Sequence, residues 1–289
     1  MDYLSLFTEM LLARGLADNT VRNYQTYIKP YLAYLQGLGI SPDTASWQVM
    51  RDFLKYLKES RSLSERTLNM VISHLQFFHV YVLHKQWEPT QVPFRRFRTY
   101  LPFVPSRELV GTFIASFDDL KMKLAISLLY ATGLRLDELC HLRCRDIYLG
   151  EGKVHVADSK NRRDRFVPLP ASLKPLILYY WKSFPTGRRP RLWLFTQQHS
   201  LDAPMDKQWV QDRILKQRQL LGVDGRLTAH SFRHAFATHS YENGMDLLSL
   251  MTFLGHRSIN STAIYVHLAA ASSCTITNPF DQIGGGLRA

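Results

Sequence analysis

Residues 229–241, AHSFRHAFATHSY, form the stretch of sequence that most narrowly limits the fold and the chemistry of this chain. The composition favours a helix, and positions three apart lie on the same face of a helix. His230 and Arg233 therefore share a face, where an imidazole and a guanidinium together can bind an anion. Phe232 and Phe236 mark the opposite, buried face. Taken alone, a single histidine in a helix is more often a structural residue.

Downstream of this segment the chain predicts two further helices, over residues 246–254 and 262–270. The first ends at Gly255, which places His256 in the following turn, and Tyr265 comes nine residues after that histidine. The chain holds 14 tyrosines. Tyr265 considered apart from the surrounding motifs would therefore not be a candidate functional residue.

Upstream, residues 131–139 read ATGLRLDEL and join two predicted helices. The first, over residues 120–132, ends at Gly133, and Arg135 lies in the bend before the second. An arginine at a helix N-terminus meets positive partial charge, so we expect an anion such as phosphate beside it. Glu138 is close enough in sequence to orient this arginine. The alternative is an ordinary surface ion pair between the two residues.

A basic hairpin turn lies between these segments. Strands predicted at residues 154–156 and 166–167 flank the turn, residues 159–165, SKNRRDR. A lysine at its tip, Lys160, can reach into a groove. The turn contains four cations that together favour contact with phosphates: Lys160, Arg162, Arg163 and Arg165. The alternative, which we favour for Arg162 and Arg163, is a solvated loop or plain backbone contact.

The first 85 residues contain four stripes of apolar residues at helical spacing, which predict a small helical bundle. Pro30 should kink or divide the second helix. Ser62 and Glu65 stand at the spacing of a capping box before the fourth.

We therefore predict three parts: a helical domain at 1–87, a basic proline-rich linker at 88–105, and a second domain with a C-terminal tail at 106–289. The linker contributes three candidate DNA contacts, Arg95, Arg96 and Arg98. The predicted fold class is mainly α with a small antiparallel β-sheet.

The composition points to a polyanionic partner. The 289 residues carry 36 Lys and Arg against 24 Asp and Glu, a net charge of +12, and both halves of the chain are basic. No apolar stretch approaches the roughly 20 residues of a membrane span, and no secretory signal is visible. Three cysteines fit a reducing compartment. We expect a cytoplasmic, nucleoid-associated protein without membrane contact.

The order of these motifs resembles the tyrosine recombinase (phage integrase) family. The similar segments are residues 132–139 (TGLRLDEL), 165–169 (RFVPL), 230–238 (HSFRHAFAT), 254–259 (LGHRSI) and 262–267 (TAIYVH). The resemblance implies that the domain at 1–87 is a core-binding (DNA-binding) domain and that the domain at 106–289 is catalytic. It also assigns six active-site positions: Arg135, Lys160, His230, Arg233, His256 and Tyr265. One departure is that Ser159 and Asn161 flank the lysine, where the family commonly has glycines.

What the resemblance implies is a site-specific recombinase that forms a covalent 3′-phosphotyrosine intermediate and exchanges strands through a Holliday junction. Tyr265 would be the nucleophile, with the two arginines holding the phosphate and His256 donating to it. His230 would accept the phenol proton, and Lys160 would protonate the departing 5′-oxygen.

The resemblance also implies the partners of the protein. These are double-stranded DNA recombination sites held in a C-shaped clamp, and a homotetramer assembled on paired sites. Neither cofactor nor metal is expected. The tail after Tyr265 would dock on a neighbouring protomer or on its own domain.

Several alternatives compete with this hypothesis. A metal-dependent nuclease would need converging carboxylates, which are scattered here. A zinc site at Cys140, His141 and Cys144 would have too few ligands. A type IB topoisomerase-like enzyme matches the order of motifs less well, and an inactive DNA-binding protein would have lost one of the six positions. Integration, excision or transposition of a mobile element and dimer resolution of the Xer type remain open as the biological task.

Overall fold

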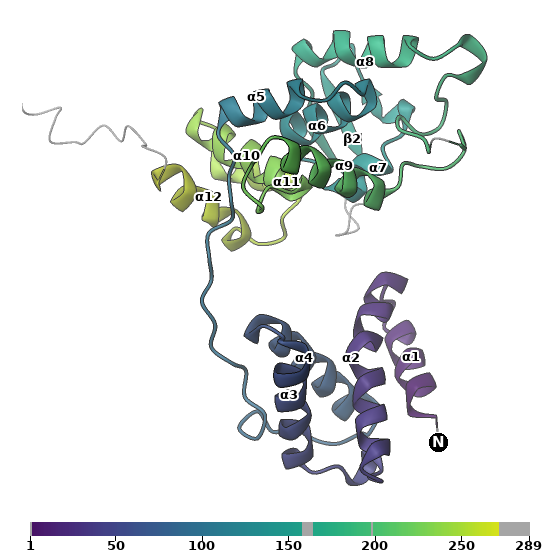
Figure 1. Cartoon of the computed structure of the whole chain (residues 1–289), viewed down its shortest axis with the longest axis vertical. Helices are drawn as coiled ribbons and strands as arrows, with labels where there is room; N and C mark the ends of the chain where they lie inside the picture. The colour runs from purple at the N-terminus through teal and green to yellow at the C-terminus, as the bar shows by residue number, and fades with distance from the viewer. Residues whose placement is uncertain (1, 158–163, 198, 272–289) are drawn as a thin grey trace, which may run out of the picture. The chain divides into compact units, whose positions relative to one another are not determined.

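The computed structural model describes residues 2–157, 164–197 and 199–271 (Figure 1). These residues form two compact units that divide between Tyr100 and Leu101. Each unit has its own hydrophobic core. The two units are therefore described one at a time.

The first unit consists of four α-helices, α1 (Tyr3–Ala13), α2 (Asp18–Gly37), α3 (Trp47–Arg61) and α4 (Glu65–Tyr81), with a 3-10 turn at Pro42–Thr44. One apolar stripe from each helix meets in the middle, as the sequence predicts. Fully buried members of this core include Phe7, Leu11, Ile28, Leu35, Phe53, Leu57, Leu68 and Phe78.

Two local expectations for this unit are corrected. Pro30 lies inside α2 without dividing it, because burial of Ile28, Tyr31 and Leu35 on one continuous face outweighs a single lost backbone hydrogen bond. A kink at Pro30 stays a prediction. The N-cap of α4 is Ser64, which accepts from the backbone N–H of Thr67 at 3.2 Å.

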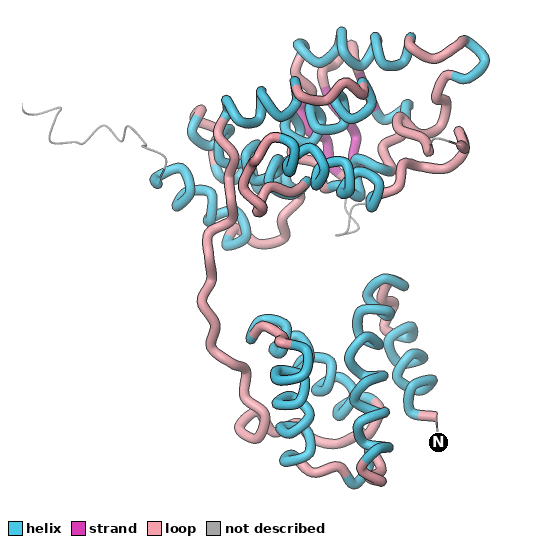
Figure 2. Tube along the Cα trace, viewed as in Figure 1, coloured by secondary structure: helices cyan, strands magenta, loops and turns pink. Residues whose placement is uncertain are grey.

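The segment predicted as a linker, residues 88–105, is a loop throughout the described chain (Figure 2), but its ends pack on the two units. Val92 is buried in the first core. Asn69 on α4 pairs with the backbone of Arg95 in both directions, at 2.7 and 2.9 Å. Phe103 and Val104 pack against the second core. The freely solvated part of the linker is therefore short.

The second unit is mostly helical. Its α-helices are α5 (Arg107–Ala115), α6 (Leu120–Thr132), α7 (Leu136–Cys140), α8 (Lys174–Lys182), α9 (Lys207–Leu220), α10 (Ala229–Glu242), α11 (Leu247–Leu254) and α12 (Asn260–Ala271), with 3-10 turns at Cys144–Asp146, Ala171–Leu173 and Thr186–Arg188. The strands β1 (Ile147–Tyr148), β2 (Lys153–Val156) and β3 (Arg165–Pro168) form one antiparallel sheet in the order β1-β2-β3. His155 of β2 pairs with Phe166 of β3. The predicted fold class, mainly α with a small antiparallel sheet, is confirmed.

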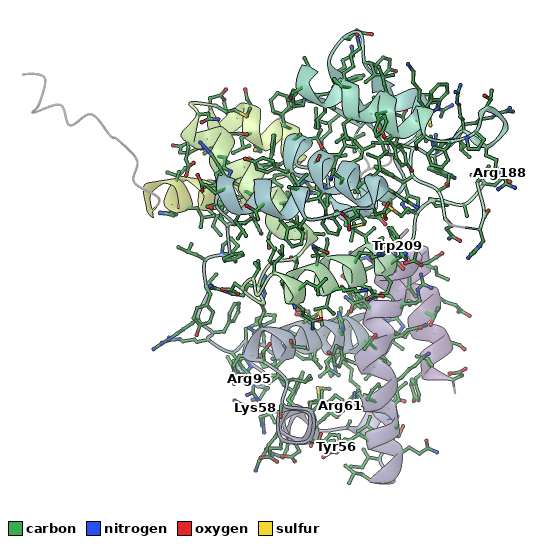
Figure 3. The ribbon with its side chains drawn as sticks, turned by 45° about the horizontal axis from the view of Figure 1, so that its top comes forward. Tyr56, Lys58, Arg61, Arg95, Arg188 and Trp209 are labelled. Atoms are coloured by element: carbon green, nitrogen blue, oxygen red, sulfur yellow. The ribbon has the colours of Figure 1, made fainter. Side chains whose placement is uncertain are left out.

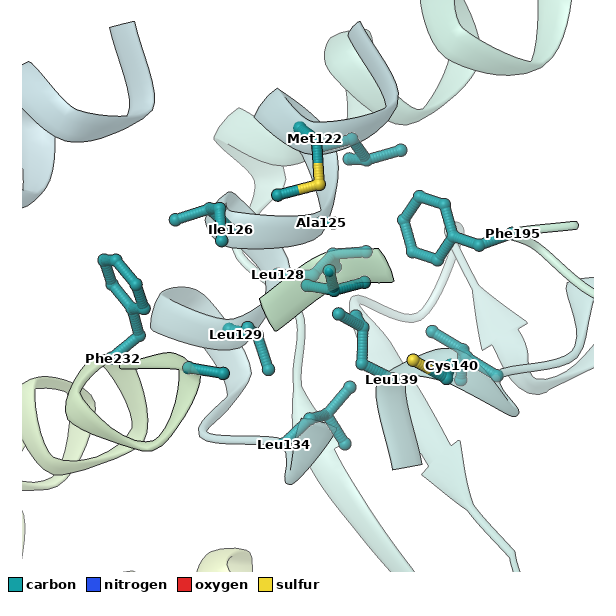
Figure 4. Close-up of a cluster of buried hydrophobic side chains, with 14 of the residues drawn as sticks. Met122, Ala125, Ile126, Leu128, Leu129, Leu134, Leu139, Cys140, Phe195 and Phe232 are labelled. Atoms are coloured by element: carbon teal, nitrogen blue, oxygen red, sulfur yellow. The ribbon is translucent and has the colours of Figure 1, made fainter. Parts of the chain in front are cut away.

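Helix α6 forms the middle of this unit. It is apolar around most of its circumference, so it packs against α5, α8 and α10 at once. Its side chains interlock with Leu134, Leu139, Cys140, Phe195 and Phe232 (Figure 4). Helix α10 packs in turn against α6, α11 and α12. The polar side chains of α10 are therefore held on a rigid, buried support.

Glycines end the two helices that flank the predicted site. Gly133 after α6 and Gly255 after α11 both have a φ of +63°, a conformation that favours glycine. At Gly133 a Cβ atom would lie 2.4 Å from the ring of Phe236, so a side chain has no room there. These turns bring the backbone carbonyls of Gly133 and Leu254 close to α10. No helix of the described residues has the length and apolar character needed to cross a membrane.

Candidate active site

Tyr265 lies on α12 and faces α10 from within the protein. Only 2% of its surface is exposed. Its hydroxyl lies 3.1 Å from Nδ1 of His234, and the ring of His256 stacks nearly parallel to its own at 6.4 Å. Burial raises the pKa of this phenol, and the positive charges of Arg233 and Arg135 act in the opposite direction. The predicted nucleophile is therefore neutral, and the positive charges of two arginines act on it.

Arg233 on α10 is the most deeply buried charged group near Tyr265, with 1% of its surface exposed. It donates to the carbonyl oxygen of Gly133 at 2.7 Å and to that of Leu254 at 2.6 Å. Burial and the charge of Arg135 lower its pKa to about 9. The guanidinium therefore remains protonated at neutral pH, held by backbone acceptors that carry no full charge.

His256 lies between Arg233 and the start of α12. Its Nε2 atom is 3.0 Å from Nη2 of Arg233, and its Nδ1 atom is 2.8 Å from Oγ1 of Thr262. An arginine cannot accept a hydrogen bond, so Nε2 must be the acceptor and the ring proton must lie on Nδ1, donated to Thr262. Burial lowers the pKa of His256 to about 4, with the nearby arginines adding to the effect. The resting imidazole is therefore neutral.

Arg135 occupies the bend before α7, as predicted, and is tied to Glu138 twice. Its backbone N–H donates to Glu138 at 2.8 Å, and its Nη1 donates to the same carboxylate at 2.8 Å. Arg165 at the start of β3 binds that carboxylate from another side, at 2.9 and 2.7 Å, and also donates to the carbonyl oxygen of Phe253. Glu138 therefore links the helix bend that carries Arg135 to the sheet.

The pKa of Glu138 reflects a competition. Burial raises the pKa of its carboxyl, but hydrogen bonds and charge from Arg165, together with Arg135, outweigh burial and lower it to about 2. In the described part of this cluster, Arg135 and Arg165 form ion pairs with this single carboxylate, and Arg233 interacts with it through charge alone. The excess positive charge suits an anion such as a phosphodiester.

His230 lies at the start of α10, on the face it shares with Arg233 and His234. Its side chain is exposed, and its ring meets the ring of His234 edge-on at 4.5 Å. Partial desolvation and the charges of Arg233 and Arg135 lower its pKa. No hydrogen bond joins His230 to Tyr265 among the described residues, so its predicted role as proton acceptor stays a prediction.

The remaining predicted site residues fall into two groups. Lys160, Arg162 and Arg163 lie outside the described residues. The first unit carries the others: Arg96 and Arg98 are exposed, whereas Arg95 is half-buried and forms an ion pair with Glu65 at 3.2 Å. Glu65 also contacts Lys58. Figure 3 labels Lys58 and Arg95, the two partners of Glu65, in this unit. Their predicted DNA contacts stay predictions.

Arg165 has a different environment from the one a DNA contact requires. Only 7% of its surface is exposed, and its guanidinium is occupied by Glu138 and Phe253. The sequence places it among the basic residues of the turn, but the structure makes it the first residue of a paired strand. We therefore assign it to positioning Glu138 rather than to DNA.

Two contacts around Tyr265 involve residues to which the sequence analysis gave no role. His234 follows Arg233 directly, and its position four residues after His230 was the available signal that it shares the same helix face. Thr262 is buried at the start of α12, and a threonine in a first helical turn commonly serves only the helix. The contact of His234 with Tyr265 depends on the packing of α10 against α12, and that of Thr262 with His256 depends on the turn between α11 and α12.

Each residue considered for zinc has other surroundings in the structure. Cys140 is fully buried in the core, where burial raises the pKa of its thiol to about 12. His141 contacts the backbone of Asp137, and Cys144 points to the carbonyl oxygen of Pro190. Across the described residues, no three His, Cys, Asp or Glu side chains form a group that could hold a metal ion.

Comparison with known proteins shows the family of the chain. Residues 106–272 match the phage integrase family, and residues 4–86 match the phage integrase N-terminal SAM-like domain. The chain is 31% identical over 276 residues to the tyrosine recombinase XerA of Pyrococcus furiosus, covering 93% of this chain and 90% of that protein. The resemblance inferred from the motifs is thereby confirmed.

Two solved structures have the same fold. The Tn1549 transposon integrase in complex with circular intermediate DNA gives a TM-score of 0.72 at 19% identity, with both chains fully covered. The XerH site-specific recombinase bound to a palindromic difH substrate gives 0.71 at 20% identity, covering 94% of this chain and 82% of that one. The chain belongs to the phage integrase family: it is a tyrosine recombinase, an enzyme that breaks and rejoins DNA.

Proposed function

We propose that Tyr265 attacks a DNA phosphate and forms a 3′-phosphotyrosine, releasing a 5′-hydroxyl that can later reverse the reaction on another strand. The observation that carries this proposal is the buried Tyr265 hydroxyl in one cluster with Arg233, His256 and Arg135. The phosphodiester bond energy is kept in the protein–DNA ester. The reaction therefore needs neither ATP nor a nucleotide cofactor.

Arg135 and Arg233 would hold the non-bridging oxygens and stabilise the charge of the pentacoordinate transition state. His256 would donate a further hydrogen bond. Because its Nε2 accepts from Arg233 in the resting protein, His256 must take up a proton or change tautomer before it can donate. Arrival of the phosphate anion favours that protonation.

The leaving 5′-oxygen needs a proton. Lys160 is our proposed donor, with Arg162 and Arg163 as substitutes should the lysine be inert. These three residues lie outside the described part of the chain, so the proposal for them rests on the motif order alone. Substitution of Lys160 with alanine should slow cleavage of an ordinary substrate. A substrate with a 5′-phosphorothiolate leaving group, which needs no proton, should restore the rate.

The partner is double-stranded DNA, which we propose binds to both units, with Arg95, Arg96 and Arg98 contacting the backbone. A complete exchange cuts four strands and each protomer has one Tyr265, so four protomers must assemble on two paired sites and act through a Holliday junction. The tail beyond residue 271 is our candidate for the contact between protomers. We place this reaction on the nucleoid in the cytoplasm.

Truncation after Ala271 tests the proposed role of the tail. Loss of synapsis, with the melting temperature and single-site DNA binding retained, supports docking on a neighbouring protomer. A collapsed melting temperature would mean that the tail completes its own domain.

The DNA site must be found before cleavage can be tested. We would select duplexes from a random library with the Tyr265→Phe protein, which keeps the packing of the ring and lacks the nucleophilic oxygen. The selected site is then nicked near the cleavage position, so that cleavage frees a short strand and traps the covalent complex. Wild-type protein should give an adduct on a denaturing gel in EDTA and without ATP, and the Phe variant should give none.

Two results would contradict this proposal. An adduct formed by Tyr265→Phe would move the nucleophile to another residue. Strict dependence of the cleavage step on Mg²⁺ would restore the metal-dependent nuclease. The position of the selected sequence in the genome also distinguishes the biological tasks. The ends of a mobile element and the sites at which replicon dimers are resolved lie at different positions relative to the gene.

A further inference from the structure

We propose that His234, rather than His230, accepts the Tyr265 phenol proton during strand cleavage; this inference rests on the function proposed above. The Tyr265 hydroxyl lies 3.1 Å from Nδ1 of His234, within hydrogen-bonding distance. His234 therefore touches the reacting oxygen in the resting protein. A general base must first meet this geometric requirement.

The placement of His234 follows from helix geometry. His230, Arg233 and His234 occupy one face of α10, and this helix packs directly against α12, which carries Tyr265 (Figure 1). His230 is one turn closer to the N-terminus and solvent-exposed, with its ring edge against that of His234. His234 thus lies between the exposed histidine and the tyrosine. A proton taken by His234 has a neighbouring imidazole through which it can leave.

The surroundings of His234 keep its ring neutral before DNA binds. Burial lowers its pKa to about 4, and the groups facing it from α10 and from the turn after α11 add to this effect: His230, Arg233 and His256. A neutral ring has one unprotonated nitrogen, which at Nδ1 can accept from the phenol. A phosphodiester bound by Arg135 and Arg233 would offset the positive charge nearby and make His234 more basic when substrate is present.

The proposed step balances as follows. The Tyr265 oxygen forms a bond to phosphorus as the bond from phosphorus to the 5′-oxygen breaks. The phenol proton moves to Nδ1 of His234, and the 5′-oxygen takes a proton from its own donor, for which Lys160 is proposed. Rejoining runs in reverse, with His234 returning its proton to the tyrosine oxygen.

The same helix provides a matched control. Five residues further along α10, Nδ1 of His239 lies 3.0 Å from the hydroxyl of Tyr130. This second pair is also largely buried, and burial also lowers the pKa of His239. It joins α10 to α6 instead of α12. His239→Asn therefore disturbs an equivalent histidine–tyrosine contact without touching the reacting tyrosine.

The test compares single-turnover cleavage of the nicked site by wild type, His234→Asn, His234→Phe, His230→Asn and His239→Asn. Asparagine can still hydrogen-bond to the Tyr265 hydroxyl but cannot take its proton, and phenylalanine keeps only the ring. We expect both His234 variants to cleave at least about a hundredfold more slowly than wild type, with unchanged DNA affinity. The His239 variant should cleave within about threefold of wild type.

The pH dependence separates proton transfer from positioning. Without its base, the His234→Asn enzyme should cleave faster as hydroxide rises, about tenfold per pH unit at alkaline pH, while the wild-type rate levels off. A His234→Asn rate within threefold of wild type would overturn the inference. So would a loss confined to His230→Asn, or a slow His234→Asn enzyme whose pH profile matches that of wild type.

The two proposals fail in different ways. If wild-type protein forms no adduct, the proposed function fails before His234 is in question. If wild type forms the adduct, Tyr265→Phe does not, and both His234 variants are as fast as the His239 control, then the recombinase stands and His234 has no part in proton transfer.

Discussion

Arg165 binds both carboxylate oxygens of Glu138, at 2.9 and 2.7 Å, although 27 positions separate the two residues in the chain. Both side chains are almost completely buried, with 6% and 5% exposed. The same carboxylate also accepts from Arg135. The position of a proposed phosphate-binding arginine therefore depends on a residue of the sheet.

Glu138→Ala should lower the free energy of unfolding by about 3–5 kcal/mol, because removing one partner of a buried ion pair leaves the other charge uncompensated. Two buried or half-buried arginines would then face each other. Urea unfolding measures the loss. The matched control is Glu59→Ala, which breaks an exposed pair with Lys55 and should cost no more than about 0.5 kcal/mol. Equal losses in the two variants would mean that the Glu138 cluster gives no more stability than a surface ion pair.

Stability should decline as the pH falls from about 6.5 toward 4, and His256 should account for part of the decline. Its pKa is lowered to about 4 in the folded protein, so between these values the unfolded chain binds more protons. His256→Gln should reduce the slope of unfolding free energy against pH by roughly 0.5–1.4 kcal/mol per pH unit. Urea titrations between pH 5 and 7 stay above the range in which Glu138 titrates. An unchanged slope would contradict the assignment of a neutral His256.

Gly133→Ala should destabilise the protein well beyond the usual cost of a left-handed alanine. The added Cβ would meet the Phe236 ring at 2.4 Å and displace the carbonyl that holds Arg233. We expect a loss of about 2–4 kcal/mol, measured by thermal or urea unfolding. Gly39→Ala is the control, because Gly39 has a similar φ of +67° and open space around its Cβ position. A loss equal to that of the control, about 1 kcal/mol, would show that the turn can move aside.

Arg135→Ala should slow the chemical step far more than it weakens DNA binding. A well-placed donor to the transition state contributes about 3–4 kcal/mol, a factor of roughly 10²–10³ in rate. Arg135 is a better test than Arg233, because removal of the Arg233 side chain also leaves two backbone carbonyl oxygens without a hydrogen-bond donor. Filter binding and single-turnover cleavage at saturating protein separate the two effects.

The control for that experiment is Arg96→Ala on the first unit, where the side chain is exposed. It should weaken binding and reduce the salt dependence by about one unit of slope, with the saturated cleavage rate unchanged. If Arg135→Ala lowers affinity and rate by the same factor, Arg135 is an ordinary phosphate anchor.

Sequence periodicity was sufficient for much of the fold because strong local signals coincide with the tertiary structure. Helix α6 ends at Gly133 as predicted, and β2 and β3 flank the basic turn. Helix α9 carried little signal, since Val210 and Ile214 are its only buried residues among the described ones. Strand β1 has two residues and is defined as a strand by its pairing with β2. Such elements are specified by their neighbours rather than by their own pattern.

The candidate site shows the same difference between local sequence signals and contacts that depend on the tertiary structure. Motif order predicted Arg135, His230, Arg233, His256 and Tyr265 as site residues, because the types and spacing of these residues are local properties. The partners of each group were not predictable in this way. Arg165 appeared to be one more cation of a basic turn, yet its strand register turns it inward toward Glu138. Which of two histidines meets Tyr265 depends on how α12 lies on α10.

The bonds from Arg233 to the carbonyl oxygens of Gly133 and Leu254 have an evolutionary consequence. A lineage that abandons catalysis can replace Tyr265 with phenylalanine, which keeps the buried ring, but loss of Arg233 would also release the ends of α6 and α11. Selection for a folded chain alone would then preserve the arginine long after DNA cleavage has ceased. In descendants of this protein, the tyrosine is therefore the residue whose presence reports activity, and the arginine is a marker of ancestry.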